Sequence, residues 1–494
     1  MLKRNLLVLV ILLSSCTIYT TLRMPAQVTT KSDLRNLLNL LKVEVDGPVE
    51  STKDCARRLD AFYQRLFRLK GSDVALNDLT GEDLKDMVEL SFETRIVIKN
   101  RMNQLTVIDN NGLACLTKIR DTFRALRTME DYLVELYIFN EKKLERNPQN
   151  FTTFKGESPF FLVNKNFADS FEGVEDLESG DVILSRGNAY SSAAIARIGE
   201  TDTNFSHLSF VYEDPNQKQW TTEAHIEIGN IVMPIETHIE QRNARSVLFR
   251  YEDTRMADRA SECIFNKVRE QQETGTNIQY DFEMNYKDDK RIFCSEVIYK
   301  GFQCASGGKI DVPLYKTKFK KTTVPFLQTL GLKLNESNVE SFDTFGPGDI
   351  EYDHRFKLVA EWRNPAKMED SRMKDAILTK LFEWMEDYGY RFKPPFNVKT
   401  KANLAWVMRR FPINSLKEKF PLNMKSAQLD MFFTLDMVGE KLQARLVEKQ
   451  HEAARPLTPI EMYDILEDYR LQDLSKYRKR KRSSEWIRYF RPKR

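Results

Sequence analysis

One cysteine, one histidine and one glutamate have the neighbours that covalent catalysis by a thiol requires. Cys294 lies at the start of an apolar segment, and His207 opens a strand-like segment upstream of it. Between them lies Glu223, a carboxylate that could orient an imidazole. A thiol acts as a nucleophile at neutral pH when a base lies beside it and a third polar group holds that base in place. With five histidines and six cysteines in the chain, few other residues could fill these roles.

The apolar residues after Cys294 predict a helix that begins at this cysteine and runs to about Phe302. A helix N-terminus presents unpaired N–H groups and the positive end of the helix dipole, which favour a thiolate and can stabilise an oxyanion. A single cysteine before apolar residues is also typical of an inert core thiol. The position of Cys294 is therefore suggestive only in combination with the histidine.

Two strand-like segments place polar side chains where they could meet. Alternation along the first segment puts His207 on the face opposite Leu208 and Phe210. Alternation along residues 219–228 puts Glu223 and His225 together on a polar face. If the two strands pair, either residue could accept the ring N–H of the first histidine and fix its tautomer. Strand phase alone does not choose between them.

Several short motifs follow one another along the chain in a fixed order. They are Gly180–Ile183, Ser206–Tyr212, Glu223–Ala224, Tyr280–Asp281, Cys294–Glu296, Gly348–Phe356 and Val359–Arg363. With this ordered set the sequence is similar to the circularly permuted NlpC-like cysteine hydrolases with a papain-like core, and more narrowly to the YiiX/YebB-like group, over about residues 175–365. This resemblance implies Cys294 as the nucleophile, His207 as the base and Glu223 as the orienting residue.

The first residues read as a targeting signal. Two basic residues precede eight consecutive apolar ones, Leu6 to Leu13, a run too short to span a bilayer. The following Leu13-Ser14-Ser15-Cys16 resembles a bacterial lipobox, in which the cysteine is lipidated. We therefore expect a lipid-anchored protein of the bacterial cell envelope, on the periplasmic face of the outer membrane. A plain secretory signal with an incidental Cys16 is the alternative.

Changes in sequence texture divide the chain into four regions. We predict a signal peptide at 1–16, a helical domain at 17–150, a hydrolase domain at 151–365 and a helical C-terminal region at 366–494. The hydrolase domain is expected to be of class α+β, with an antiparallel sheet and a nucleophile helix. Residues 476–494 carry ten Lys or Arg and one Glu. This basic tail could bind an anionic polymer or lipid, or be a solvated flexible segment.

Export to an oxidising compartment makes the remaining cysteines candidates for disulfides. Cys55 and Cys115 lie within the same helical region and are a plausible pair, although the sequence does not establish any pairing. Buried free thiols at 55, 115, 263 and 304 are the alternative.

The function expected from these features is an envelope hydrolase that forms a thioester acyl-enzyme and cleaves cell-wall peptides or acyl-amides, with no cofactor. A lipid-directed acyltransferase or lipase is the alternative enzyme, and an apolar channel beside Cys294 would favour it. A non-catalytic scaffold would instead have an unreactive cysteine. A metal site of His207, His225 and Cys294 is a further alternative, but these residues form no compact ligand motif. The net charge of +4 gives no reason to expect nucleic acid as a partner.

Overall fold

The structure is a computed structural model of the 494-residue chain. It describes residues 31–66, 79–106, 113–141, 156–239, 243–288, 290–342, 344–409 and 423–492. The predicted signal peptide and Cys16 lie outside these residues. No helix within the described ranges is both long enough and apolar enough to cross a membrane.

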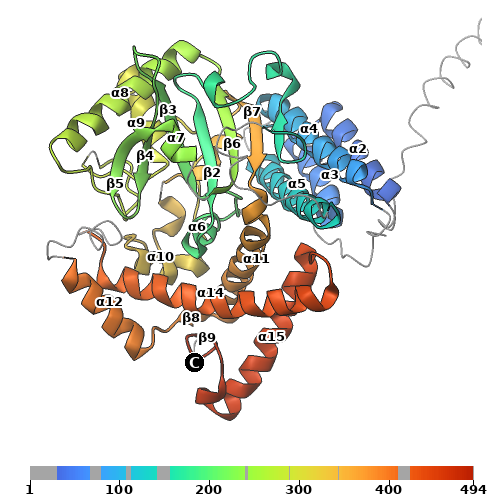
Figure 1. Cartoon of the computed structure of the whole chain (residues 1–494), viewed down its shortest axis with the longest axis vertical. Helices are drawn as coiled ribbons and strands as arrows, with labels where there is room; N and C mark the ends of the chain where they lie inside the picture. Colours follow the sequence, from blue (N-terminus) through green and yellow to red (C-terminus); the bar gives the residue numbers. More distant parts are fainter. Residues whose placement is uncertain are drawn as a thin grey trace, which may run out of the picture.

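The N-terminal region is a bundle of long helices, as its apolar periodicity predicts. They are α2 (Lys31–Asp46), α3 (Thr52–Leu66), α4 (Gly81–Thr106) and α5 (Leu113–Asn140). A disulfide between Cys55 and Cys115 joins α3 to α5, so the expected pair is present. Figure 1 shows this bundle in blue, packed beside the sheet.

A seven-stranded antiparallel sheet forms the centre of the molecule. Its order is β1-β7-β6-β2-β3-β4-β5, so the chain returns from far downstream to insert β7 between β1 and β6. Leu208 and Phe210 join the core on one face and Val211 joins the core on the other, which confirms the predicted alternation. The strands are β1 (Phe161–Val163), β2 (Val182–Gly187), β3 (His207–Glu213), β4 (Gln219–His225), β5 (Gly229–Pro234), β6 (Asn243–Tyr251) and β7 (Phe356–Arg363).

Two helices pack on the sheet and position the cysteine. Helix α8 (Thr254–Glu273) is linked to α9 (Glu296–Ser306) by a second disulfide, Cys263–Cys304, which the sequence did not indicate. Gly301 lets α9 approach α8 closely, because a Cβ at this position would lie 2.6 Å from the carbonyl oxygen of Ala260. The short helices α6 (Tyr190–Ile195) and α7 (Ile235–Ile239) lie in the connections between strands.

The C-terminal region is helical and ends in a small sheet. Its basic tail is folded: Trp486, Ile487 and Phe490 are fully buried, and Asp473 accepts hydrogen bonds from backbone amides of the tail. The alternative of a flexible solvated tail is therefore wrong for the described residues. The elements are α10 (Val324–Leu330), α11 (Pro365–Tyr388), β8 (Tyr390–Phe392), α12 (Phe396–Met408), α14 (Ser426–Ala453), α15 (Pro459–Lys479) and β9 (Phe490–Pro492), which pairs with β8.

A buried network of ion pairs joins the N-terminal bundle to the sheet. Arg95 on α4 lies 2.7 Å from Glu130 on α5 and 2.7 Å from Glu361 on β7. Arg363 on β7 contacts Asp131 on α5 at 2.9 Å. These side chains are inaccessible or nearly so, and removing one partner of a buried pair leaves an uncompensated charge. The two regions therefore share one interior.

We predict that Gly301→Ala lowers the melting temperature, because the added Cβ would collide with backbone on α8 and push α9 away. Overpacking of this kind costs about 1–3 kcal/mol, so a loss of several degrees is expected in a thermal melt followed by circular dichroism. Gly47→Ala is the matched control, since its Cβ would meet nothing closer than 3.5 Å. An unchanged melting temperature for Gly301→Ala would contradict the close packing of α8 and α9.

Candidate active site

Cys294 lies in a turn just before α9, with a side chain that is 4% exposed. It is the one free cysteine among those the structure describes. The helix begins at Glu296, two residues later than predicted, with Ser295 as its N-cap, and it runs to Ser306. The sulfur lies 4.0 Å from the carbonyl oxygen of Ser206. The thiol therefore sits beside the residue that precedes the histidine strand.

Pairing of β3 with β4 brings His207 to Glu223. The register sets Ser209 opposite Glu223, so the histidine lies diagonally across from the carboxylate. His207 Nε2 and Glu223 Oε2 are 2.8 Å apart. His225 Nε2 also lies 2.9 Å from Oε2. The carboxylate thus lies between the two histidines, and it is Glu223 that hydrogen-bonds the ring of His207.

A third histidine, which the sequence analysis missed, completes the surroundings of the carboxylate. His238 on α7 is fully buried, and its Nδ1 lies 2.7 Å from Glu223 Oε1. The Thr221 hydroxyl donates to the same oxygen at 2.7 Å. The only sequence signal for His238 was its residue type, because no motif surrounds it. Both oxygens of Glu223 are therefore fixed by neighbours on β3, β4 and α7.

Burial and hydrogen bonding act in opposite directions on these groups. Burial raises the pKa of Glu223, but the three histidines outweigh it and hold this pKa well below the usual value. Burial lowers the pKa of His207, but its side-chain hydrogen bonds with Cys294 and Glu223 raise this pKa to about 10. Because Glu223 occupies Nε2, Nδ1 is the ring nitrogen available to the thiol. At neutral pH the arrangement favours an imidazolium beside the Glu223 carboxylate.

Tyr280 contacts the thiol from another side. Its side chain is buried, and burial together with the nearby Cys294 raises the pKa of its hydroxyl well above the usual value. The hydroxyl therefore keeps its proton near neutral pH and remains a hydrogen-bond donor beside the sulfur. The sequence analysis had singled out the Tyr280–Asp281 motif only through the family resemblance.

An apolar cleft of about 600 Å³, part of it open to solvent, reaches Cys294. Nearly all of its walls are aliphatic or aromatic, and they come from α6, α10, α14 and the segment before the cysteine. Apart from the motifs at Tyr280–Asp281 and Cys294–Glu296, no sequence motif marked these walls, because they converge only in the tertiary structure. The lining residues are Ser191, Ala194, Ile195, Ile198, Ile226, Tyr280, Asp281, Phe282, Met284, Cys294, Ser295, Phe326, Leu330, Leu332, Pro347 and Phe432.

A second cleft of about 610 Å³ adjoins the first and shares Ser191, Ile226 and Phe432 with it. Its lining is more polar, with Glu227 and Asp436 beside aromatic residues of α14. Burial and the neighbouring Glu440 raise the pKa of Asp436 to about 6. The two clefts together form a path from an acidic outer part to an apolar inner part that ends at the thiol.

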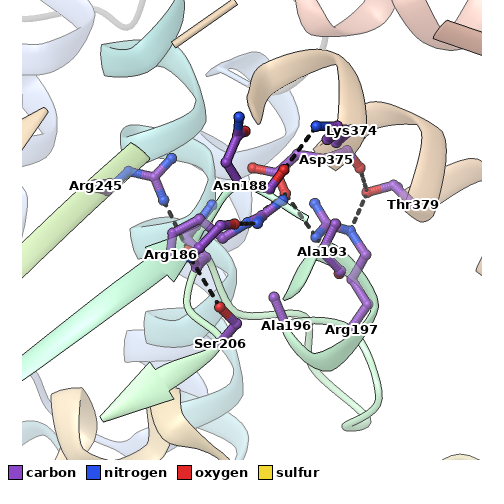
Figure 2. A network of polar contacts seen from close by, with 12 residues as sticks. Arg186, Asn188, Ala193, Ala196, Arg197, Ser206, Arg245, Lys374, Asp375 and Thr379 are labelled. Carbon is purple, nitrogen blue, oxygen red and sulfur yellow. Dashed lines mark hydrogen bonds and ion pairs between the residues drawn. The ribbon is translucent and has the colours of Figure 1, made fainter. Parts of the chain in front are cut away.

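Helix α11 fixes the loop that forms one wall of the inner cleft. Asp375 Oδ1 accepts a hydrogen bond from Arg186 Nη2 at 2.9 Å and one from Arg197 Nη1 at 3.0 Å (Figure 2). The backbone carbonyl of Asn188 accepts from Lys374 Nζ at 2.7 Å. These contacts hold both ends of the loop that carries α6 and leads to His207. The C-terminal region thereby positions part of the site.

His207, Glu223 and His225 could also hold a metal ion, because their ligand atoms all lie within 4.8 Å of one another. This set differs from the one that the sequence offered and did not favour, which had Cys294 in place of Glu223. Two imidazoles and a carboxylate suit a divalent transition metal. However, an ion there would take the place of the ring protons that now join both histidines to the carboxylate.

Residues 176–344 match the family model described as permuted papain-like amidase enzyme, YaeF/YiiX, C92 family. A similar solved structure is that of the metalloprotein yiiX from Escherichia coli O157:H7, with 20% identity and a TM-score of 0.27, covering 37% of this chain and 96% of that chain. No curated protein matches the chain. The YiiX-like resemblance is confirmed over residues 176–344, and the α+β class is confirmed as well.

We predict that Glu223→Gln slows alkylation of Cys294 by iodoacetamide at pH 6–7. Loss of the carboxylate removes an interaction that raises the pKa of His207, so the imidazolium loses its proton at a lower pH than the value of about 10. The ion pair is then less populated at neutral pH, and rapid labelling should require a more alkaline solution. Mass spectrometry across pH 5–10 measures the labelling rate at each cysteine.

Glu213→Gln, at the exposed end of β3, is the matched control and should leave the profile unchanged. If Glu223→Gln labels at the same rate as the unaltered protein at every pH, the carboxylate does not stabilise the imidazolium and the pair is only structural.

Proposed function

We propose that this protein is a cysteine amidase in which Cys294 is the nucleophile, His207 the general base and acid, and Glu223 the residue that orients the imidazole. The observation that carries the proposal is the free, buried thiol beside a histidine whose other nitrogen is held by a buried carboxylate, within a domain of the permuted papain-like amidase kind. His225 and His238 act through Glu223 as positioning residues.

The reaction follows from the positions of these groups. The Cys294 thiolate attacks the carbonyl carbon of an amide, a C–S bond forms, and the carbonyl electrons move onto oxygen. Backbone N–H groups at the start of α9, together with the Tyr280 hydroxyl, can donate to this oxyanion. His207 then gives its proton to the leaving nitrogen as the C–N bond breaks, which leaves a thioester on the enzyme.

Water completes the cycle. His207, now neutral, takes a proton from a water molecule as that water attacks the thioester carbonyl. Collapse of the second oxyanion breaks the C–S bond, releases the carboxylic acid and restores the ion pair. Attack by an alcohol or amine in place of water would give acyl transfer, so the same site serves either outcome.

The inner cleft favours acyl-amides over cell-wall peptides as substrates. Peptides of a cell wall are polar and charged, whereas the cleft beside Cys294 is lined almost wholly by carbon. A long aliphatic acyl group would bury apolar surface there, at up to about 0.8 kcal/mol for each methylene. We therefore propose an amide or ester with an apolar acyl chain as the substrate class. Lipid-directed acyl transfer is the second candidate, favoured by the same cleft.

We also propose that the protein works in the cell envelope as a lipoprotein attached through Cys16. The two disulfides, Cys55–Cys115 and Cys263–Cys304, support this location, because stable disulfides are typical of exported proteins. Mass spectrometry of the membrane fraction, with and without Cys16→Ser, tests the attachment.

We predict that kcat/KM for fluorogenic N-acyl amides rises with acyl length, by up to about fourfold for each added methylene. Cys294→Ala should reduce turnover by at least about 10⁴-fold. Leu330→Trp, which narrows the inner cleft, should shorten the preferred chain while leaving Cys294 labelling unchanged. Leu471→Trp, on the exposed surface of α15, is the matched control.

Two results would contradict the proposal. If the enzyme cleaves charged peptide amides faster than long-chain acyl amides, cell-wall peptides rather than acyl-amides are its substrates. Turnover that survives Cys294→Ala, or a Cys294 that labels no faster than a thiol in unfolded protein, would make the domain a non-catalytic scaffold.

A further inference from the structure

Helix α12 exposes an unusual amount of apolar side chain. Phe396 is 85% exposed, Leu404 60% and Val407 46%. They are three of the eight large apolar residues that the described part of the chain leaves exposed. Single exposed apolar residues are ordinary, but several on one helix mark an interaction surface.

The three exposed apolar residues of α12 lie on one side of the helix, with the exposed Thr400 among them. At about 100° per residue, Phe396, Leu404 and Val407 fall within about 80° of arc. The opposite side is buried against the protein, through Val398 and Ala402. The helix thus has two apolar faces, one packed against its own fold and one turned outward, and Figure 1 shows it at the edge of the molecule beside α14.

Lysines flank the outward stripe on both sides. Lys399 and Lys401 are exposed and lie about 60° beyond its two edges. Arg391 and Lys393 precede α12 in the sequence, and no Asp or Glu occurs in the described residues 389–409. Asp430 on α14 interacts with Lys399, so the wider surface carries both charge signs. An apolar stripe flanked by lysines fits a helix that lies in the interface of an anionic bilayer.

We propose that α12 docks this protein onto a membrane of anionic phospholipid, with Phe396, Leu404 and Val407 inserted between the lipids and Lys399 and Lys401 at the phosphate level. A second copy of the chain is a poorer occupant of this surface, because two such faces would bring lysine against lysine. The lipid proposal is independent of Cys16, which lies outside the described residues.

The docked helix would bring the clefts to the lipid. Ala402 and Trp406 on the inner face of α12 pack in one cluster with Met424, Leu429 and Phe432. These last three residues line the outer cleft, and Phe432 also lines the inner one. A lipid entering beside α12 would pass Glu227 and Asp436 in the outer cleft and then reach Cys294 along the apolar walls of the inner cleft. This second step rests on the proposed function, whereas membrane docking does not.

The test is vesicle binding by the full chain carrying Cys16→Ser, so that no covalent lipid contributes. We expect co-flotation with vesicles containing phosphatidylglycerol and much weaker binding to pure phosphatidylcholine. Replacing Phe396, Leu404 and Val407 together by serine should weaken binding to the anionic vesicles at least about tenfold. Lys399→Glu with Lys401→Glu should do the same.

Matched controls separate this surface from others. Leu471→Ser removes an exposed leucine on α15, and Lys479→Glu with Lys481→Glu reverses two charges in the basic tail. Both should bind vesicles as the unaltered chain does. The inference is overturned if the α12 variants bind normally, if the tail variant alone loses binding, or if the α12 variants abolish a dimer in sedimentation while no form binds vesicles. Vesicle binding by a catalytically inactive chain would leave the inference standing and refute only the proposed function.

Discussion

The rest of the site depends on one buried carboxylate. Glu223 is inaccessible to solvent, and a charge in that position is tolerated only when it is fully hydrogen-bonded. Its two oxygens are shared by three imidazoles and one hydroxyl, from β3, β4 and α7. Pairing of β3 with β4 fixes the backbone of this part of the site, and Glu223 fixes the three imidazole rings through hydrogen bonds. The orientation of the His207 ring is therefore fixed by the fold itself.

The cleft that reaches the thiol depends on parts of the chain outside the family match. Residues 176–344 supply Cys294, His207 and Glu223, but α14 contributes Phe432 to the cleft. Helix α11 contributes Asp375, which holds the loop of α6 in place. The candidate triad and the walls of the cleft thus come from different regions of the chain.

Local sequence patterns predicted the parts of the site that local structure determines. Alternation placed His207 and Glu223 on strands that pair. The apolar segment after Cys294 predicted a helix, which begins at Glu296, two residues later than expected. His238 and the cleft were not predictable, since both arise from tertiary packing of distant segments. The sequence left open a flexible tail, because its many charged residues outnumber the few apolar ones. In the structure Trp486 is buried and β9 of the tail pairs with β8, contacts that the local sequence does not indicate.

The buried arginines between the N-terminal bundle and the sheet limit how this protein can be divided. Arg363 and Glu361 lie on β7, beyond the end of the family match, yet β7 is an interior strand. A fragment cut at the borders of that match would lose β7 and expose the edge of β6. It would also leave the buried Arg245 without its ion-pair partner, Asp131. The N-terminal bundle and the sheet therefore depend on each other, because their buried charges are balanced only when both are present.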